Sequence, residues 1–203
     1  PPGEFIDLME RFNQLGQLSE QLISRAARDA VAFRQLVPGL TMSVNVDPQQ
    51  LRSSDLPRLM RSAIGNDLSG WVIEVTERAA LGEDVAARDG LARLRRDGAQ
   101  LSLDDFGTGY SSVLSLKSWA FDEVKIDRAF VTDIQDEGSR DLVVTMLGMV
   151  RALGARAVVE GIEDAVQAQV LREIGADVLQ GYLFGRPMAS ADALAWLTQN
   201  ALV

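Results

Sequence analysis

Six short apolar segments each carry an ionisable or amide side chain near the carboxyl end. These side chains are Asn45 in SVNV, Glu74 in VIEVTE, Asp104 and Asp105 in LSLDD, Lys125 in VKID, Glu160 in AVVE and Gln180 in VLQGY. Burying a charge is costly unless the charge is paired or bound to a metal. A single such residue is most simply a core polar group satisfied by a neighbour, but six similar placements point to one shared site.

The residue types in this set favour oxygen-ligated metal chemistry. Carboxylates and an amide carbonyl are the ligands that Mg²⁺ and Mn²⁺ prefer in proteins. The adjacent Asp104 and Asp105 suit either one bridging position or two separate ions. Two ions about 3.5–4 Å apart support in-line displacement at phosphorus. We therefore expect a Mg²⁺ or Mn²⁺ site, with Lys125 as the one cation among the carboxylates.

The composition excludes several other classes of site. The 203 residues contain no Cys and no His, which rules out disulfides, thiolate or imidazole metal ligands and Ser-His-Asp triads. The formal net charge of −9 does not suit a protein that binds duplex nucleic acid by neutralising phosphates. No run of 18 apolar residues and no signal peptide is present, so we expect a soluble, cytoplasmic chain with no membrane segment.

Strand-like segments alternate with helix-like segments along the whole chain. Strands are expected at 41–46, 71–76, 100–105, 123–127, 156–160 and 178–184, and helices within 4–36 and at 84–97, 139–153, 164–174 and from 190 onward. Ser139, Asp164 and Ser190 are the expected N-caps of the last three helices. This alternation predicts an α/β fold of parallel βα units. Neither a G-x-G-x-x-G nor a Walker A motif occurs, which favours a (β/α)₈ TIM-like barrel, in which strand carboxyl ends share one site.

A glycine-rich segment follows Asp105 directly. It reads Gly107, Thr108, Gly109, Tyr110, Ser111 and Ser112. Glycines and small hydroxyl residues after a strand form tight loops with exposed backbone N–H groups. The same composition also fits a simple turn into a helix capped by Ser111 or Ser112, and both interpretations remain open here.

Several segments together resemble one protein family. LSLDDFGTGYSSV (101–113), VKIDRAFV (124–131), VVEGIED (158–164) and LQGYLFGRPM (179–188) resemble the EAL family, the bacterial phosphodiesterases that linearise cyclic di-GMP. SVNVDPQQL (43–51), IEVTE (73–77) and PPGEFIDLME (1–10) match further blocks in the same order. The resemblance extends over essentially the whole chain.

The resemblance implies a role for each candidate residue. It implies metal ligation by Asn45, Glu74 and Asp104, service of a second ion or its water by Asp105 and Glu160, and positioning of water or phosphate by Lys125. Gln180 would contact substrate, and Arg186 is a candidate for phosphate or guanine although an exposed loop arginine is a common feature. Glu77 would anchor a regulatory loop formed by Gly107, Thr108, Gly109, Tyr110 and Ser111. Glu77 and Glu163 also fit a solvated surface role.

One family feature is absent from these residues. No Glu-Ala-Leu tripeptide occurs, and six strands are recognisable where a barrel needs eight, so two would lie upstream. We expect one EAL-type domain over 1–203 that is incomplete at its N-terminus, either as part of a longer protein, as a degenerate domain, or completed by another chain. Without the glutamate of that motif, the segment alone is expected to hydrolyse substrate poorly or not at all.

Three functional hypotheses follow. The first is metal-dependent hydrolysis of cyclic di-GMP to linear pGpG with a two-metal Mg²⁺ or Mn²⁺ site. The second is a catalytically silent domain that binds cyclic di-GMP or a partner protein. The third, an enolase-type Mg²⁺ site with a lysine base, leaves DDFGTGYSS unexplained. The resemblance also makes a homodimer and a preceding sensor or GGDEF domain plausible partners.

Overall fold

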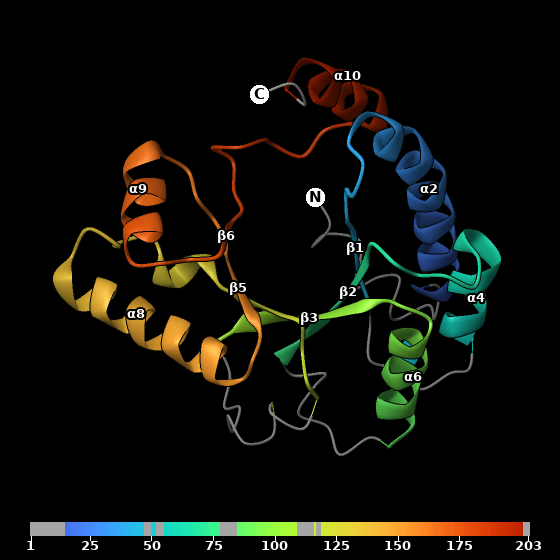
Figure 1. Ribbon diagram of the computed structural model, residues 1–203, viewed down its shortest axis with the longest axis horizontal. Helices are drawn as coiled ribbons and strands as arrows, with labels where there is room; N and C mark the ends of the chain where they lie inside the picture. Colours follow the sequence, from blue (N-terminus) through green and yellow to red (C-terminus); the bar gives the residue numbers. More distant parts are fainter. Residues whose placement is uncertain are drawn as a thin grey trace. The chain divides into compact units, whose positions relative to one another are not determined.

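The computed structural model describes residues 15–46, 50–51, 55–77, 85–108, 116 and 119–200. Within these residues six strands form one sheet, in the order β1-β2-β3-β4-β5-β6. Helices alternate with the strands along the chain, and β3 to β6 are paired in parallel (Figure 1). This confirms the α/β class, with six of the eight strands that build a (β/α)₈ barrel. No helix in the described ranges has both the length and the apolar character needed to cross a membrane.

The described residues divide into two compact units. The first contains α2 (Leu15–Leu36), β1 (Met42–Asn45), α4 (Asp55–Ile64), the first two residues of β2 (Trp71–Thr76), α6 (Val85–Arg96) and α10 (Ser190–Asn200). In this unit α2 packs against both α4 and α10. Arg34 of α2 donates to the carbonyls of Leu40 and Gly70 and lies over the Trp71 ring, which ties the helix to the ends of two loops.

The second unit contains the remainder of β2 and the chain from residue 100 to 188. Its elements are β3 (Gln100–Phe106), β4 (Glu123–Ile126), the 3₁₀ turn η1 (Arg128–Phe130), α8 (Glu137–Ala152), β5 (Arg156–Val159), α9 (Ala165–Glu173) and β6 (Val178–Leu179). α8 packs against β5 (Figure 1). Four of its residues are buried, Val143, Met146, Leu147 and Val150. Their spacing of three or four residues gives the helix one apolar face.

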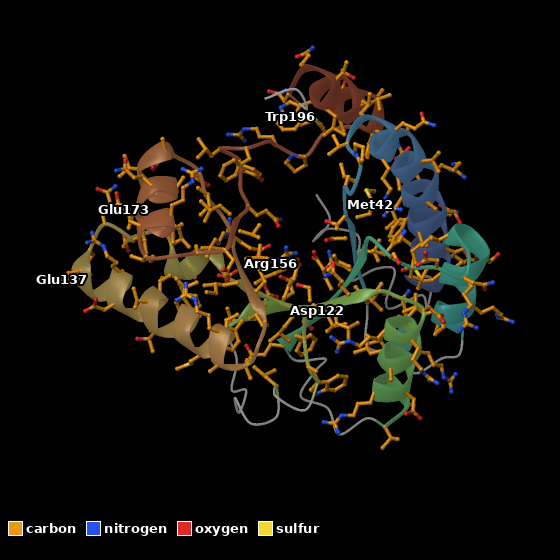
Figure 2. All side chains as sticks on the ribbon, in the orientation of Figure 1. Met42, Asp122, Glu137, Arg156, Glu173 and Trp196 are labelled. Atoms are coloured by element: carbon orange, nitrogen blue, oxygen red, sulfur yellow. The ribbon has the colours of Figure 1, made fainter. Side chains whose placement is uncertain are left out.

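Aspartates hold the amino ends of the strands in the second unit. Asp122, just before β4, accepts the backbone N–H of Leu101 at 2.9 Å, and Asp177, just before β6, accepts that of Ala157 at 2.9 Å. Arg156 at the start of β5 pairs with Glu123 at the start of β4. Figure 2 labels Asp122 and Arg156 among the side chains of this unit. Polar side chains at this edge are therefore occupied by the fold itself, which leaves the carboxyl ends for chemistry.

Two expected boundaries are wrong. Helix α8 is capped by Asp136, not by Ser139, because the Asp136 carboxylate accepts the Ser139 N–H and starts the helix at Glu137. Strand β6 ends at Leu179 and does not extend to 184, because Gln180 and Leu183 turn away to pair with the backbone of Ile162. A Cβ at Gly181 would collide with that backbone, so the turn requires glycine there. The predicted cap Asp164 is confirmed, as part of a capping box with Gln167.

Candidate active site

Lys125 is the centre of the candidate site. Its ammonium lies 2.9 Å from a carboxylate oxygen of Glu74, 3.1 Å from one of Asp104 and 2.7 Å from one of Glu160. The four residues come from β2, β3, β4 and the residue directly after β5. The sequence-based expectation that these strand-end side chains lie together is therefore confirmed for these four, which we call the Lys125 cluster.

The strands position the cluster by their alternation. Val124 and Ile126 are fully buried on either side of Lys125, and Ile73 and Val75 are nearly so on either side of Glu74. Because successive side chains of a strand point to opposite faces, the apolar neighbours fill one face and the charged residue is presented on the other. Lys125 and Glu74 are themselves only 5% and 7% exposed, so their charges must satisfy each other.

The cluster has too few cations for its carboxylates. Burial alone would lower the pKa of Lys125, but its hydrogen bonds to Glu160 and Glu74 raise that pKa above its usual range. Burial raises the pKa of Glu160, and the nearby Asp104 and Glu74 add to this rise although Lys125 opposes it. One ammonium faces three carboxylates, so the cluster has an excess of negative charge and an affinity for further cations or protons.

Asp105 occupies a strained position beside the cluster. Its backbone φ is +59°, in the left-handed region, and the β3–β4 register shifts between Leu103 and Phe106. A bulge of this kind redirects side chains relative to the regular pleat. Burial raises the pKa of Asp105, and the charges of Asp104 and Asp127 raise it further. The Asp105 carboxylate lies among other acidic groups, and this surrounding favours its binding of a proton or a cation.

The predicted regulatory loop has one described anchor. The buried Glu77 carboxylate accepts the backbone N–H of Gly107 at 3.1 Å, and the Thr108 hydroxyl donates to the carbonyl of Asp105 at 2.8 Å. Gly109, Tyr110 and Ser111 lie outside the described residues. The link from Glu77 to the start of the loop agrees with an anchoring role for Glu77, and the solvated alternative for it is wrong.

Three further predicted residues are Asn45, Gln180 and Arg186. Asn45 is exposed at the end of β1 in the first unit. Gln180 follows β6 and lines a cavity in the second unit that also reaches Glu160. Arg186 is exposed, with its guanidinium 4.6 Å from the centroid of the Tyr182 ring. Gln180 therefore shares a cavity with Glu160, a member of the Lys125 cluster.

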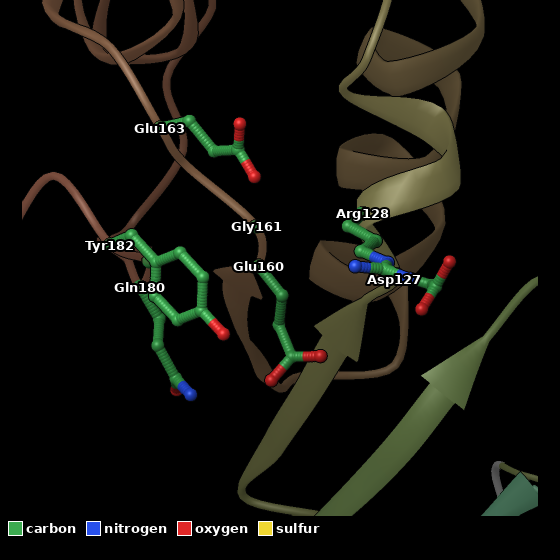
Figure 3. Close-up of a pocket in the computed structure, with 8 residues that line it drawn as sticks. Asp127, Arg128, Glu160, Gly161, Glu163, Gln180 and Tyr182 are labelled. Carbon is green, nitrogen blue, oxygen red and sulfur yellow. The ribbon is translucent and has the colours of Figure 1, made fainter. Parts of the chain in front are cut away.

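That cavity measures about 320 Å³ and has Glu160 of the Lys125 cluster in its lining (Figure 3). It is lined by Asp127, Arg128, Glu160, Gly161, Glu163, Gln180, Gly181 and Tyr182. Three of these residues, Asp127, Arg128 and Tyr182, were not among the site residues predicted from the sequence. Only their position in the sequence could have indicated them, because each lies within the three residues that follow the end of a parallel strand.

The donor set fits a divalent metal by its chemistry. Glu74, Asp104, Asp105 and Glu160 all offer carboxylate oxygens, and hard oxygen ligands suit Mg²⁺ and Mn²⁺. In the described residues, however, no group of three or more acidic side chains is arranged to hold one ion. Glu74, Asp104 and Glu160 contact the Lys125 ammonium. Binding of a metal would therefore exchange some of these ion pairs for metal ligation, and the ligand assignments stay predictions.

Comparison with known proteins identifies the family. The model of the EAL domain matches residues 1–187. The chain is 35% identical to cyclic di-GMP phosphodiesterase RocR of Pseudomonas aeruginosa, over 93% of this chain and 49% of that protein. It spans from about a quarter to about half of the length of the curated relatives it matches.

Two solved structures extend this likeness to three dimensions. One, described as "PaMucR Phosphodiesterase, c-di-GMP complex", matches with a TM-score of 0.86 at 32% identity, over 95% of this chain and 80% of that one. The other is a manganese/cy-diGMP complex of BlrP1 from Klebsiella pneumoniae, with a TM-score of 0.70 at 28% identity, over 84% of this chain and 45% of that one.

Proposed function

The chain belongs to the EAL domain family, and we propose that it hydrolyses cyclic di-GMP to linear pGpG with Mg²⁺ or Mn²⁺ at a two-metal site. The observation that carries the proposal is the Lys125 cluster, in which carboxylates from β2, from β3 and from the residue after β5 meet one ammonium within 3.1 Å. The names of RocR and of the MucR structure, which specify cyclic di-GMP, support the choice of substrate.

The residues of the cluster supply what the reaction needs. Water adds to phosphorus, the bond from phosphorus to the 3′ oxygen breaks, and the product keeps a 5′-phosphate. Lys125 would donate to a phosphate oxygen and stabilise the charge that develops there. Glu160, whose pKa is raised chiefly by burial, would accept the proton of the attacking water. When bound by Glu74, Asp104, Asp105, Glu160 and Asn45, divalent ions would polarise the phosphate and acidify this water.

The test is an incubation with cyclic di-GMP and Mg²⁺ or Mn²⁺, followed by chromatography of the nucleotides. The glutamate of the Glu-Ala-Leu motif is not among the 203 residues, so we propose weak or no turnover by this segment alone. The assay therefore uses both the segment and the protein as its gene encodes it. We expect pGpG from the encoded protein, and none when the metal is removed with EDTA.

A matched pair of variants separates chemistry from folding. Glu74→Gln removes a buried carboxylate from the Lys125 cluster, and Glu123→Gln removes a buried carboxylate from the amino end of β4. We expect Glu74→Gln to lower turnover about 100-fold or more, the scale seen when one electrostatic group of an active site is lost. Glu123→Gln should retain most activity per folded molecule. Full turnover by Glu74→Gln would contradict the proposal.

A receptor role is the second candidate. It is favoured by the pairing of the carboxylates with Lys125, because the ammonium competes with a metal ion for them. The encoded protein would then bind cyclic di-GMP without forming pGpG. The same chromatography, run beside an equilibrium binding measurement, distinguishes the two functions.

Partners and location follow from the same proposal. We propose that the chain acts in the cytoplasm, where cyclic di-GMP is a signal, as one domain over 1–203 of a larger protein and as a homodimer. The short coverage of its relatives supports a larger protein, since MucR is named a bifunctional diguanylate cyclase and phosphodiesterase. Size measurement of the purified encoded protein in solution checks the dimer.

A further inference from the structure

Gly107, the residue directly after β3, is held by side chains from three other segments. Its N–H donates to the carboxylate of Glu77, the residue after β2, at 3.1 Å. Its φ of +96° lies in the region that favours glycine, and a Cβ added there would lie 2.7 Å from Met146 Cε and 2.9 Å from Phe130 Cζ. The Phe130 ring and the Met146 methyl group therefore close directly over the Gly107 backbone.

Both apolar side chains are fixed by their own elements. Phe130 is the last residue of η1, a turn that the Asp127 carboxylate caps at its amino end. Val131, the next residue, is buried and joins this turn to the core. Met146 lies on the buried face of α8 and is itself 5% exposed. The place of Gly107 is thus set by packing from η1 and α8.

Gly107 is in turn tied to Asp105. The Asp105 carbonyl accepts the Thr108 N–H at 3.2 Å and the Thr108 hydroxyl at 2.8 Å, which closes a turn over residues 105–108. The Asp105 backbone has a φ of +59°, which is unfavourable for a residue with a side chain. Such a conformation persists only where the surrounding structure imposes it, and the packing on Gly107 supplies this constraint through the closed turn.

We propose that Phe130 and Met146 are positioning residues for Asp105, and that they act through Gly107. This rests on the proposed function, because Asp105 is one of the expected metal ligands of that site. Removal of a group that orients a metal ligand commonly changes metal affinity or activity by about 10–100-fold. A side chain that only filled the core would change stability and leave the metal affinity of the folded molecules unchanged.

The test measures Mn²⁺ binding to the encoded protein by calorimetry, with no nucleotide present. Phe130→Ala removes the ring that covers Gly107 and should weaken Mn²⁺ binding about tenfold or more. Phe130→Leu keeps an apolar side chain over the glycine and should restore most of the affinity. Phe121→Ala, which removes a buried ring just before β4, is the matched control and should lower stability without changing Mn²⁺ affinity.

Hydrogen exchange of the Gly107 N–H gives a second measurement, which needs no metal. In EDTA, Phe130→Ala should speed this exchange about tenfold or more relative to that of the buried Val124, because the bond to Glu77 opens more often. Met146→Ala removes the contact from α8 and should act in the same direction, so it decides the question if Phe130→Ala does not fold.

Two results of these measurements would overturn the inference. The first is unchanged Mn²⁺ affinity together with unchanged exchange in both alanine variants. The second is faster exchange with unchanged Mn²⁺ affinity, which would show that Phe130 and Met146 only pack against the loop.

Hydrolysis is measured separately on the same proteins by chromatography. Mn²⁺ binding that depends on Phe130, without formation of pGpG, would support the positioning role and contradict the hydrolase proposal. Formation of pGpG with the same kcat and the same Mn²⁺ affinity in Phe130→Ala would support the hydrolase and overturn the positioning role.

Discussion

Two ion-pair groups in this molecule use the same chemistry in opposite surroundings. In the second unit, the Lys125 ammonium meets three carboxylates, and its side chain is 6% exposed. In the first unit, Arg61 of α4 forms a two-pronged pair with Asp97, with both contacts at 2.7 Å, and the arginine side chain is 49% exposed. The Lys125 cluster is buried and has fewer positive than negative charges. The Arg61–Asp97 pair is exposed to solvent and has one charge of each sign.

The difference indicates what each group is for. An exposed pair is screened by water and salt and contributes little to folding. A buried charged group loses its hydration on folding. An excess of negative charge in a buried cluster therefore lowers the free energy of unfolding, and the rest of the core must offset this loss. In the Lys125 cluster this unfavourable excess of charge lies at the carboxyl ends of the strands, where functional residues are expected. The Arg61–Asp97 pair connects α4 to the turn after α6 at the protein surface.

The largest expected effect is the removal of the Lys125 charge. Lys125→Met keeps most of the side-chain volume but leaves Glu74, Asp104 and Glu160 without their cation. We expect the free energy of unfolding to fall by about 3–5 kcal/mol, the scale for breaking a buried ion pair. Urea denaturation in EDTA measures this loss.

Added Mn²⁺ should stabilise the Lys125→Met variant. With no ammonium competing for the carboxylates, Mn²⁺ should raise the unfolding midpoint of Lys125→Met more than that of the unchanged protein. Arg156→Met, which removes a half-exposed partner from Glu123, is the matched control and should lose little. Wild-type stability for Lys125→Met in EDTA would show that the cluster is as solvated as the surface pair.

A smaller effect of opposite sign is expected at Asp105. Because folding raises its pKa, the charged form costs stability above that pKa, and the cost disappears as the pH falls through it. Asp105→Asn removes the charge and tolerates the left-handed backbone at φ +59°. We expect a gain of about 1 kcal/mol at neutral pH that vanishes in acid, together with loss of hydrolysis.

Thermal unfolding followed across pH checks this prediction. Asp133→Asn, at an exposed position of the same unit, should leave both the midpoint and its pH dependence unchanged. A gain in stability that persists in acid would mean that the benefit of Asp105→Asn does not come from charge.

The smallest effect is expected at the surface pair. Arg61 lowers the pKa of Asp97 mainly through their hydrogen bonds, so this stabilisation is present at neutral pH and is lost as the pH falls through that lowered pKa. Arg61→Gln should lower the melting temperature only slightly, and less so in high salt, which screens exposed charges. A loss as large as that of Lys125→Met would remove the distinction between the two groups.

Much of the site could be predicted from the sequence, because the carboxyl ends of parallel strands lie at the same edge of a sheet. Glu74, Asp104, Lys125 and Glu160 each stand in an apolar run, and parallel strands bring such residues to one edge. The helix cap Asp164 was also readable, because its partner Gln167 is three residues away. The end of β6 was not, since the turn at Gln180 depends on the backbone of Ile162, which is 18 residues earlier in the chain.

The sequence by itself determined the α/β class, the family and the charged residues of the cluster, because these depend on local pattern and on motifs. Only the tertiary structure decided that Lys125 contacts three carboxylates at once, and that Arg128, Glu160 and Gln180 line one cavity. Pairing and burial depend on distances between residues far apart in the chain, and no local pattern encodes those distances.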